Sequence, residues 1–350
     1  MPVREKPIRK DFFNLDERAM GIISDRYRLA DVDCFLPILV DGNRCTLLEV
    51  RSETSKKVIV ECGDARYFFK QIPWYCDTDE QVAMSTALQQ ELGRAGVPVA
   101  RLVATGDGRL WTSIHDERFV LFEFSNGRRY EGRPQQTRAA AGTLARLHAA
   151  EVVVPGAPGE DVFSIAYDHI QLLETVWGKQ DRDAAPVAGA YRAFLRRAEG
   201  RAGAAGFGGL PAVAVHGDYN PWNLLFADDD QVQTVLDFDN CDVAARLHDV
   251  AEAVLTFCVL AYREDSTNFA RTQPDAPDAA AISAFLSAYQ AVSPLTGTEK
   301  KCLPWALGAV FVELTCLGFI RDDFGPDHLP ALVRLLDRLV AAVPDEEAAR

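Results

Sequence analysis

The sequence predicts an α+β protein of two lobes, a small antiparallel β-rich lobe at residues 45–125 and a larger, mainly helical lobe at 126–350. Short apolar segments separated by turn residues dominate the first part. Apolar residues recur at helical spacing through most of the second part. The chain has 350 residues, 48% of them hydrophobic, which is enough for two hydrophobic cores.

The first lobe is predicted to hold an antiparallel sheet. Its expected strands lie at residues 45–50, 58–61, 66–72 and 119–124. Asp77 and Glu80 are expected to open a helix, because acidic residues favour a helix start. Residues 1–44 precede this lobe as a predicted helical extension, since Asn14 followed by Glu17 is typical of a helix N-terminus.

The second lobe is predicted to be helical from Gln135 onwards, with one flexible, glycine-rich connector at residues 200–211. The connector leads to the segment 215–240, where two short strands are expected. Further helices are predicted at about 164–178, 183–200, 247–262, 277–291, 303–320 and 328–343.

Composition excludes some classes of function. The net charge of −14 argues against a nucleic-acid partner, whose phosphates would be repelled, but permits a cationic small-molecule partner. The sequence has no uninterrupted run of eighteen apolar residues and therefore predicts no membrane span. Its first residues lack the apolar core of a signal peptide. The eight cysteines have no C-x-x-C spacing, which predicts reduced thiols and a cytoplasmic location.

The most informative segment is VHGDYNPWNLLF at residues 215–226, followed by VLDFDN at 235–240. It supplies Asp218, Asn223 and Asp237 between apolar stretches. Phosphoryl transfer needs an acidic group that accepts the proton of the attacking hydroxyl, and oxygen ligands that hold Mg²⁺ on the nucleotide. The segment therefore predicts a phosphoryl-transfer site, with Asp218 as the base and with Asn223 and Asp237 as metal ligands.

Local structure supports this interpretation. The apolar runs 224–226 and 232–236 are predicted to pair as a hairpin, which would place Asn223 and Asp237 at neighbouring strand ends. Asp239 is either a second metal contact or part of the turn. His216 is expected to pack within the loop, because the scattered histidines and cysteines do not form a zinc pattern.

The pattern HGD-x-x-x-x-N followed by DFD resembles the aminoglycoside phosphotransferase and choline kinase-like superfamily. The resemblance implies a protein-kinase-like fold, with ATP and Mg²⁺ as cofactors. Eukaryotic protein kinases match less well, since Gly217 stands where they have Arg, Asp239 replaces the Gly of DFG, and no A-P-E follows. Asp249, in RLHDVA, is similar to the family's downstream aspartate that braces the catalytic loop.

The resemblance also implies a nucleotide site in the first lobe. Backbone groups of Glu123 and Ser125 would contact adenine, at the hinge between the lobes. The hydroxyls of Ser52, Thr54 and Ser55 would contact the phosphates from a turn that lacks the usual glycines.

Lys70, on the third strand, would clamp the α- and β-phosphates of ATP. A helix glutamate normally holds that lysine, and none stands at the expected position near Met84 and Ser85. Glu80, one turn earlier, is either its partner or only a favourable charge at the helix start. Glu91 is a weaker candidate for the same role.

The predicted function is ATP-dependent phosphorylation of a hydroxyl on a small molecule, such as an aminoglycoside-like antibiotic, an amino alcohol or a sugar. Two alternatives stay open. The first is a kinase that phosphorylates Ser or Thr of a peptide in natural-product biosynthesis. The second is a non-catalytic pseudokinase or scaffold, which the missing helix glutamate and the unusual phosphate turn would favour. The sequence predicts no oligomeric state.

Overall fold

The computed structural model describes residues 45–51, 57–62, 64–73, 76, 78–114, 117–152, 159–260 and 277–343. The helical extension at 1–44 and the phosphate turn with Ser52, Thr54 and Ser55 lie outside these residues. Two compact units form, and each is described separately. Among the described residues, unit 1 holds those up to Arg128, Val152 and residues 234–241, and unit 2 holds the others.

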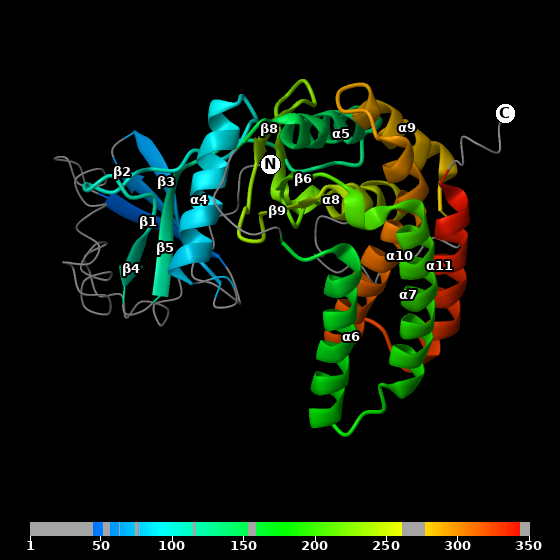
Figure 1. Ribbon diagram of the computed structural model, residues 1–350. Coiled ribbons are helices and arrows are strands. Elements are labelled where there is room, and N and C mark those ends of the chain that lie inside the picture. The colour runs from blue at the N-terminus through cyan, green and yellow to red at the C-terminus, as the bar shows by residue number, and fades with distance from the viewer. Residues whose placement is uncertain are drawn as a thin grey trace. The chain divides into compact units, whose positions relative to one another are not determined.

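Unit 1 is built on an antiparallel sheet with strand order β1-β2-β3-β5-β4 (Figure 1). Its strands are β1 (Cys45–Arg51), β2 (Lys57–Cys62), β3 (Ala65–Gln71), β4 (Thr112–Ile114) and β5 (Glu117–Glu123). The predicted strands of this lobe are thus confirmed, with shifts of one or two residues at their ends. In the register of β3 and β5, Lys70 lies opposite Val120 near the centre of the sheet.

Helix α4 (Asp79–Arg94) packs on this sheet through a small core of Ile72, Val82 and Val120. The prediction that Asp77 and Glu80 open the helix was wrong in detail. Thr78 is the N-cap, because its hydroxyl accepts the Gln81 N–H while the Gln81 side chain reaches back to the Thr78 N–H. On this helix Leu88 and Leu92 are fully buried, and Met84 is half-buried.

The turn that carries DFD packs with unit 1, although the sequence analysis assigned it to the helical lobe. Its strand connects to unit 1 by backbone hydrogen bonds. The Val235 N–H donates to the Pro98 carbonyl at 2.6 Å, and the Ala100 N–H donates to the Val235 carbonyl at 3.1 Å. A distant segment of the first lobe therefore supplies an additional pairing partner for this strand, which sequence spacing cannot reveal.

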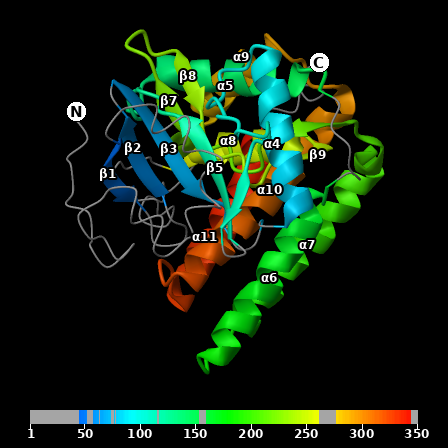
Figure 2. The same ribbon diagram turned by 90° about the vertical axis from the view of Figure 1, so that its left-hand side faces the viewer.

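Unit 2 is mainly helical, and α10 is its central helix. The helices are α5 (Pro134–Ala149), α6 (Val162–Lys179), α7 (Ala185–Ala205), α8 (Leu247–Val254), the π-helical turn η4 (Leu255–Val259), α9 (Ala279–Gln290), α10 (Gly297–Ile320) and α11 (Leu329–Ala342). Helix α10 packs against α6, α7, α8 and α11, and the two views show α6 and α7 running antiparallel beside it (Figures 1 and 2). Helix α5 packs against α9.

Two helix boundaries differ from the predictions. Helix α7 continues through Ala205, so the expected flexible connector is largely helical, and it ends where Gly206 adopts a positive φ of 98°. Helix α10 begins at Gly297 after the Thr296 cap, not at 303. The buried apolar surface of α10 outweighs the loss of one helical hydrogen bond at Pro304, which lies inside the helix.

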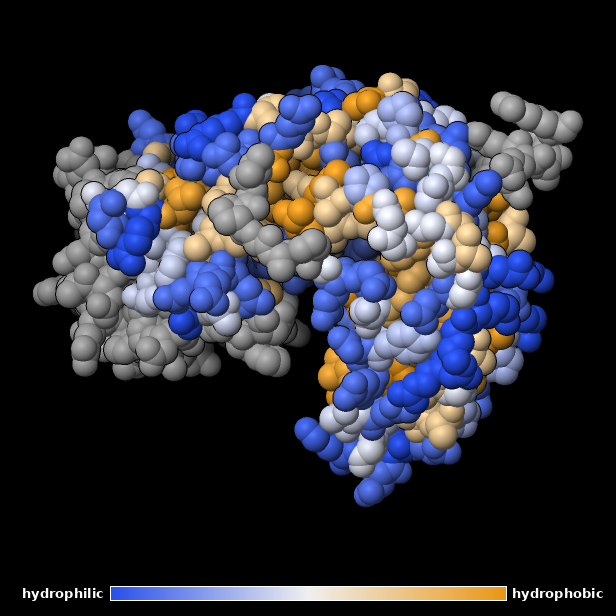
Figure 3. Space-filling model, viewed as in Figure 1, coloured by the Kyte–Doolittle hydropathy of each residue, from blue (hydrophilic) through white to orange (hydrophobic). Residues whose placement is uncertain are grey.

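Burial explains the strongly apolar character of α10. Its length and composition would suit a membrane span, but 72% of its most apolar window is buried inside the protein, as expected for a core helix. By contrast, α7 is amphipathic. It buries Tyr191, Leu195 and Ala198 at helical spacing, and its side facing the viewer in Figure 3 is largely hydrophilic.

Two short strand pairs position the segment 216–223 of unit 2. Strand β6 (Ala212–Val215) pairs antiparallel with β9 (Asp242–Ala245). Strand β7 (Leu224–Phe226) pairs with β8 (Val232–Val235), which confirms the predicted hairpin. The segment 216–223 is therefore a loop held between the ends of β6 and β7, and its last three residues form a 3₁₀ turn, Pro221–Asn223.

Candidate active site

The loop 216–223 begins with a sharp change of direction after β6. Gly217 has a φ of 76°, in the left-handed region where a side chain would be strained, so a glycine suits this position. Asp218 follows directly. The Asn220 side chain then caps the 3₁₀ turn by accepting the Trp222 N–H at 3.1 Å. The loop thus has a local structural reason for its glycine and for its first asparagine.

Both carboxylate oxygens of Asp218 accept a hydrogen bond from a side-chain amide. Asn223 Nδ2 donates to Oδ2 at 2.8 Å, and Asn220 Nδ2 donates to Oδ1 at 2.5 Å. Asn223 Nδ2 also contacts the Asp218 carbonyl at 2.9 Å, which leaves the amide oxygen of Asn223 turned away from Asp218. The structure thus brings Asp218 and Asn223 together and adds Asn220, which the sequence analysis missed.

Asp249 holds the start of the loop from α8. Its two oxygens accept the backbone N–H groups of His216 and Gly217 at 2.6 and 2.8 Å. His148 Nε2 also donates to Asp249 at 3.0 Å, and the Tyr289 hydroxyl lies 2.7 Å from the other ring nitrogen of His148. Burial alone would raise the pKa of Asp249, but the hydrogen bonds with the neighbouring histidines outweigh it and hold the pKa below its usual range.

A second carboxyl of α8, Glu252, also reaches the loop. Its Oε2 accepts the Tyr219 N–H at 2.8 Å, and Glu252 is almost fully buried. Burial and the charge of Asp218 raise the pKa of Glu252 well above its usual value. Beside it, His248 Nε2 lies 3.0 Å from the Glu313 carboxylate. Neither Glu252 nor Glu313 was singled out from the sequence as a partner of the loop, because nothing in a helical pattern marks a buried carboxyl.

The His248–Glu313 pair should make stability depend on pH. Burial lowers the pKa of His248, but the charge of Glu313 and the hydrogen bonds with Asp249 and Glu313 raise it well above its usual value, with Glu252 also contributing. A raised folded-state pKa gives stability that is complete below the unfolded value of about 6.5 and is lost as pH rises through the folded value. The difference in Tm between the wild type and His248→Gln should therefore shrink at alkaline pH.

Thermal unfolding between pH 6 and pH 9 tests this expectation. His328→Gln is the matched control, because His328 is exposed and its ring contacts only a neighbouring turn among the described residues. A difference in Tm for His248→Gln that stays constant over this pH range would contradict the charged pair.

In unit 1, Lys70 lies between two carboxylates of the DFD turn. Its Nζ contacts Asp237 Oδ1 and Asp239 Oδ2, both at 2.6 Å, and its side chain is 4% exposed. Burial lowers the pKa of Lys70, but the two aspartates more than compensate and raise it. Burial also raises the pKa of Asp239 to about 6, against the attraction of Lys70. Asp237 has a φ of 66°, a backbone conformation that is uncommon outside glycine and often occurs at functional sites.

Of the two roles left open for Glu80, the structure shows the charge at the helix start and not the partner of Lys70. Glu80 is exposed in the first turn of α4, and its carboxylate has no contact with Lys70. Glu91 pairs instead with Arg94 on the helix surface. Asp239 occupies the role expected of a helix glutamate, as a buried carboxylate that faces the lysine. The extra acidic residue of DFD, compared with DFG, is the sequence signal that could have indicated this.

Replacing Lys70 by methionine should destabilise the protein by roughly 3–5 kcal/mol, the usual cost of leaving one buried ionic partner alone. Asp239, whose side chain is 10% exposed, would be that partner. The double variant Lys70→Met/Asp239→Asn should regain much of the lost stability. Urea unfolding measures both, with Lys301→Met as the control at an exposed position on α10. A single variant as stable as the wild type would contradict the buried ion pair.

The predicted hinge residues lie at the end of β5 and just after it. Glu123 is the last residue of that strand, and its N–H donates to the Arg101 carbonyl at 2.9 Å. Its carboxylate pairs with Arg101 at 3.2 Å on the surface. Ser125 is half-buried two residues later, still within unit 1. The structure therefore places both residues at the end of the sheet, and their role towards adenine stays a prediction.

The two predicted metal ligands, Asp237 in unit 1 and Asn223 in unit 2, each carry oxygen donors of the kind that Mg²⁺ prefers. The Asp237 carboxylate is 29% exposed, and the Asn223 amide directs its nitrogen to Asp218. His248, Asp249 and Glu252 also lie close enough together to hold an ion. That cluster suits structure better than metal binding, because its carboxylates already accept backbone N–H groups of the loop.

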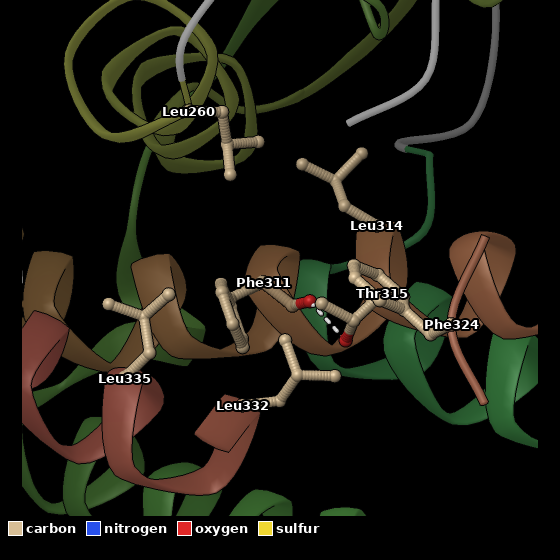
Figure 4. A pocket seen from close by; sticks show the side chains of 7 residues that line it. All are labelled: Leu260, Phe311, Leu314, Thr315, Phe324, Leu332 and Leu335. Carbon is tan, nitrogen blue, oxygen red and sulfur yellow. Dashed lines mark hydrogen bonds between the residues drawn. The ribbon is translucent and has the colours of Figure 1, made fainter. Parts of the chain in front are cut away.

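One cavity in unit 2 is apolar and does not resemble a phosphoryl-transfer site. Its lining residues come from α10, α11 and their neighbours (Figure 4): Leu260, Phe311, Leu314, Thr315, Phe324, Leu332 and Leu335. The Thr315 hydroxyl already donates to the Phe311 carbonyl at 2.7 Å. None of the described residues that line this cavity is charged.

A sequence model of the phosphotransferase enzyme family, APH, matches residues 46–295. This segment includes Lys70, the loop 216–223 and the DFD turn. Homoserine kinase of Methylobacillus flagellatus is 29% identical over 221 residues, which cover 63% of this chain and 62% of that kinase. The match thus spans less than two thirds of this relative. Homoserine kinase of Caulobacter vibrioides is 25% identical over 283 residues, covering 80% and 77%.

The fold is shared with solved kinase structures. A microcompartment-associated aminopropanol kinase superposes with a TM-score of 0.61 at 16% identity, over 89% of this chain and 95% of the other. At that identity the likeness shows the fold alone. Together with the antiparallel sheet and the helical unit, it confirms the predicted α+β, protein-kinase-like fold.

Proposed function

We propose that this chain, which belongs to the phosphotransferase enzyme family, transfers the γ-phosphoryl group of ATP to a hydroxyl of a small molecule. The observation that carries the proposal is the fixed carboxylate of Asp218. Two asparagine side chains hold its oxygens, and α8 holds the loop around it. A carboxylate fixed in this way can orient an acceptor without reorganising during the reaction.

In the proposed reaction, Asp218 accepts a hydrogen bond from the acceptor hydroxyl and takes its proton as the oxygen attacks phosphorus. A carboxylate can accept about four hydrogen bonds in all, so a bond from the acceptor hydroxyl is compatible with those from Asn220 and Asn223. The amide hydrogens also disperse the negative charge of the carboxylate. His216 takes no part in this proton transfer, because its Nδ1 accepts the Asp218 N–H at 3.2 Å and so supports the loop.

Lys70 and Asp237 would serve the nucleotide. Bound Mg²⁺ would neutralise phosphate charge and orient the transferring group. Asp237 and Asn223 have the oxygen donors to hold it, as metal ligands in this proposal. Lys70 would contact the α- and β-phosphates, which its burial favours because a charge acts more strongly where water is excluded. The backbone of Glu123 and Ser125, and the hydroxyls of Ser52, Thr54 and Ser55, remain proposed nucleotide contacts.

For the acceptor, we propose a hydroxyl compound that also carries an amino group. The two relatives reported above are homoserine kinases, and homoserine combines these two groups. The net charge of −14 favours the approach of a cationic compound over an anionic one. Aminoglycosides also combine amino and hydroxyl groups, whereas choline-like alcohols carry a quaternary ammonium beside the hydroxyl, so both belong in the same comparison.

A panel assay tests the function. Release of ADP from Mg²⁺–ATP is measured with homoserine, aminopropanol, choline, an aminoglycoside, an uncharged sugar and a Ser/Thr peptide, with Asp218→Asn as the blank. Turnover that depends on an amino alcohol supports the proposal, and turnover with the peptide alone supports the peptide kinase instead. If ATP with Mg²⁺ gave neither turnover nor a thermal shift, a non-catalytic role would replace both.

A further inference from the structure

We infer that Glu252 is a positioning residue of the catalytic loop, which acts by holding the Tyr219 amide beside Asp218. The effect of this on catalysis rests on the proposed function, because it assumes that Asp218 is the base. The hydrogen bond itself, from the Tyr219 N–H to Glu252 Oε2 at 2.8 Å, does not depend on that assumption.

The first support is the arrangement of α8. Asp249 and Glu252 are three positions apart, so both side chains leave the same face of the helix. That face is turned to the loop 216–223, since Asp249 accepts two of its backbone N–H groups and Glu252 accepts a third. One rigid helix therefore fixes the loop on both sides of Asp218, before it through Asp249 and after it through Glu252.

The second support is that side chains, not strand neighbours, satisfy the loop's backbone. Four consecutive N–H groups, from His216 to Tyr219, donate to side-chain atoms. The Asp218 N–H among them donates to the His216 ring. A loop without ladder hydrogen bonds keeps its conformation only if such side-chain partners are present. Without Glu252, the N–H directly after Asp218 would lose its acceptor.

The third support is that other contacts hold the side chain of Tyr219. Its side chain is fully buried, and its hydroxyl donates to the Ala140 carbonyl on α5 at 2.9 Å. Its ring also packs edge-on against the His216 ring, with 5.7 Å between centroids. The side chain fixes Tyr219 at its far end. The hydrogen bond from the Tyr219 N–H to Glu252 therefore sets the orientation of the peptide group that joins Tyr219 to Asp218.

Burying a carboxyl group without hydrogen-bond partners costs free energy, so the groups around the buried Glu252 carboxyl matter. The charges that face Glu252 are Asp218 from the loop, Asp249 and His248 from α8, and Glu313 from α10. Three of these four groups are acidic, and together with burial they favour the neutral form of Glu252. A neutral carboxyl still accepts the Tyr219 N–H, and it adds no further negative charge beside Asp218.

This assignment predicts different results for two substitutions. Glu252→Gln keeps a neutral acceptor of the same shape and should leave kcat within about threefold of the wild type at pH 7. Glu252→Ala leaves the Tyr219 N–H buried without a partner. It should lower kcat by roughly 5- to 150-fold, the cost of one unsatisfied buried donor at tenfold per 1.36 kcal/mol, with little change in KM for ATP.

Amide hydrogen exchange supplies a readout that does not depend on activity. Mass spectrometry of the peptide that spans 216–219 should show faster exchange in Glu252→Ala and wild-type exchange in Glu252→Gln. Thr256→Val is the matched control. Thr256 is a buried residue in the π-helical turn η4, which directly continues α8, and its hydroxyl bonds only to helix carbonyls among the described residues. If the alanine variant does not fold, Glu252→Leu makes the same comparison with the volume retained.

The outcomes separate the two proposals. Faster exchange in the loop together with reduced kcat supports the positioning role. Faster exchange in a protein that phosphorylates none of the tested acceptors supports the positioning contact and removes the proposed function. Unchanged exchange in Glu252→Ala overturns the positioning role, whatever happens to kcat. Equal losses in the glutamine and alanine variants also overturn it, because the charge and not the hydrogen bond would then matter.

Discussion

Asp237→Asn should abolish magnesium-dependent turnover, with kcat lower by about 10³-fold or more at millimolar Mg²⁺. The substitution removes the charge of a proposed metal ligand and also one of the two carboxylates that contact Lys70. Asparagine tolerates the positive φ of 66° at this position, so the backbone should persist. The loss would therefore come from the site and not from the fold.

Asp230→Asn is the matched control for this experiment. Asp230 also has a positive φ, of 63°, but it lies in the turn of the β7–β8 hairpin and pairs with Arg133. This variant should retain wild-type turnover. The measurement is kcat as a function of Mg²⁺ concentration, together with calorimetric binding of ADP with and without Mg²⁺. Wild-type turnover of Asp237→Asn at ordinary Mg²⁺ would remove Asp237 from the proposed metal ligands.

Asp218→Asn should lower kcat by about 10²- to 10⁴-fold while ATP binds as before. Asparagine has nearly the same shape, and its amide oxygen can still accept from either Asn220 or Asn223. It has no basic carboxylate to take the proton from the acceptor hydroxyl. Because Asp218 is proposed to act on the acceptor, whereas Lys70 and Asp237 are proposed to hold the nucleotide, KM for ATP should change little.

Single-turnover kinetics with saturating ATP test this prediction directly, since they isolate the chemical step from product release. The Tm of the variant should remain close to that of the wild type. Asp228→Asn, in the exposed hairpin turn, is a control for the same chemical change elsewhere in the unit. Normal phosphorylation by Asp218→Asn would mean that another group accepts the proton.

Much of the fold could be predicted from local pattern. The strands of unit 1 and the hairpin after Asn223 lie where alternating apolar residues placed them, because a strand leaves a short-range signature. Helix ends were less predictable. The Thr296 cap and the buried apolar face of α10 override Pro304, and the glycine-rich segment after residue 200 continues α7. In both places tertiary packing decided against local propensity.

The candidate site could likewise be predicted only in part from the sequence. Asp218 and Asn223 could be brought together from the sequence, since they are five positions apart in one loop and the loop folds back on itself. The partners of Lys70 could not, because Asp239 lies 169 positions away and no periodicity links the two. Glu252 could not be recognised for a related reason: a buried carboxyl on a helix becomes informative only when its acceptor role is visible.

The sequence by itself determined the reaction class. The residue types at 218, 223 and 237 are those that phosphoryl transfer requires, and their spacing along the chain is visible in the sequence. It also determined the order of a β-rich part before a helical part. Only the tertiary structure decided what holds these groups in place. The aspartates of DFD hold Lys70, and two carboxyls of α8 hold the loop around Asp218. Burial makes those contacts strong, and burial is a property of the packed chain.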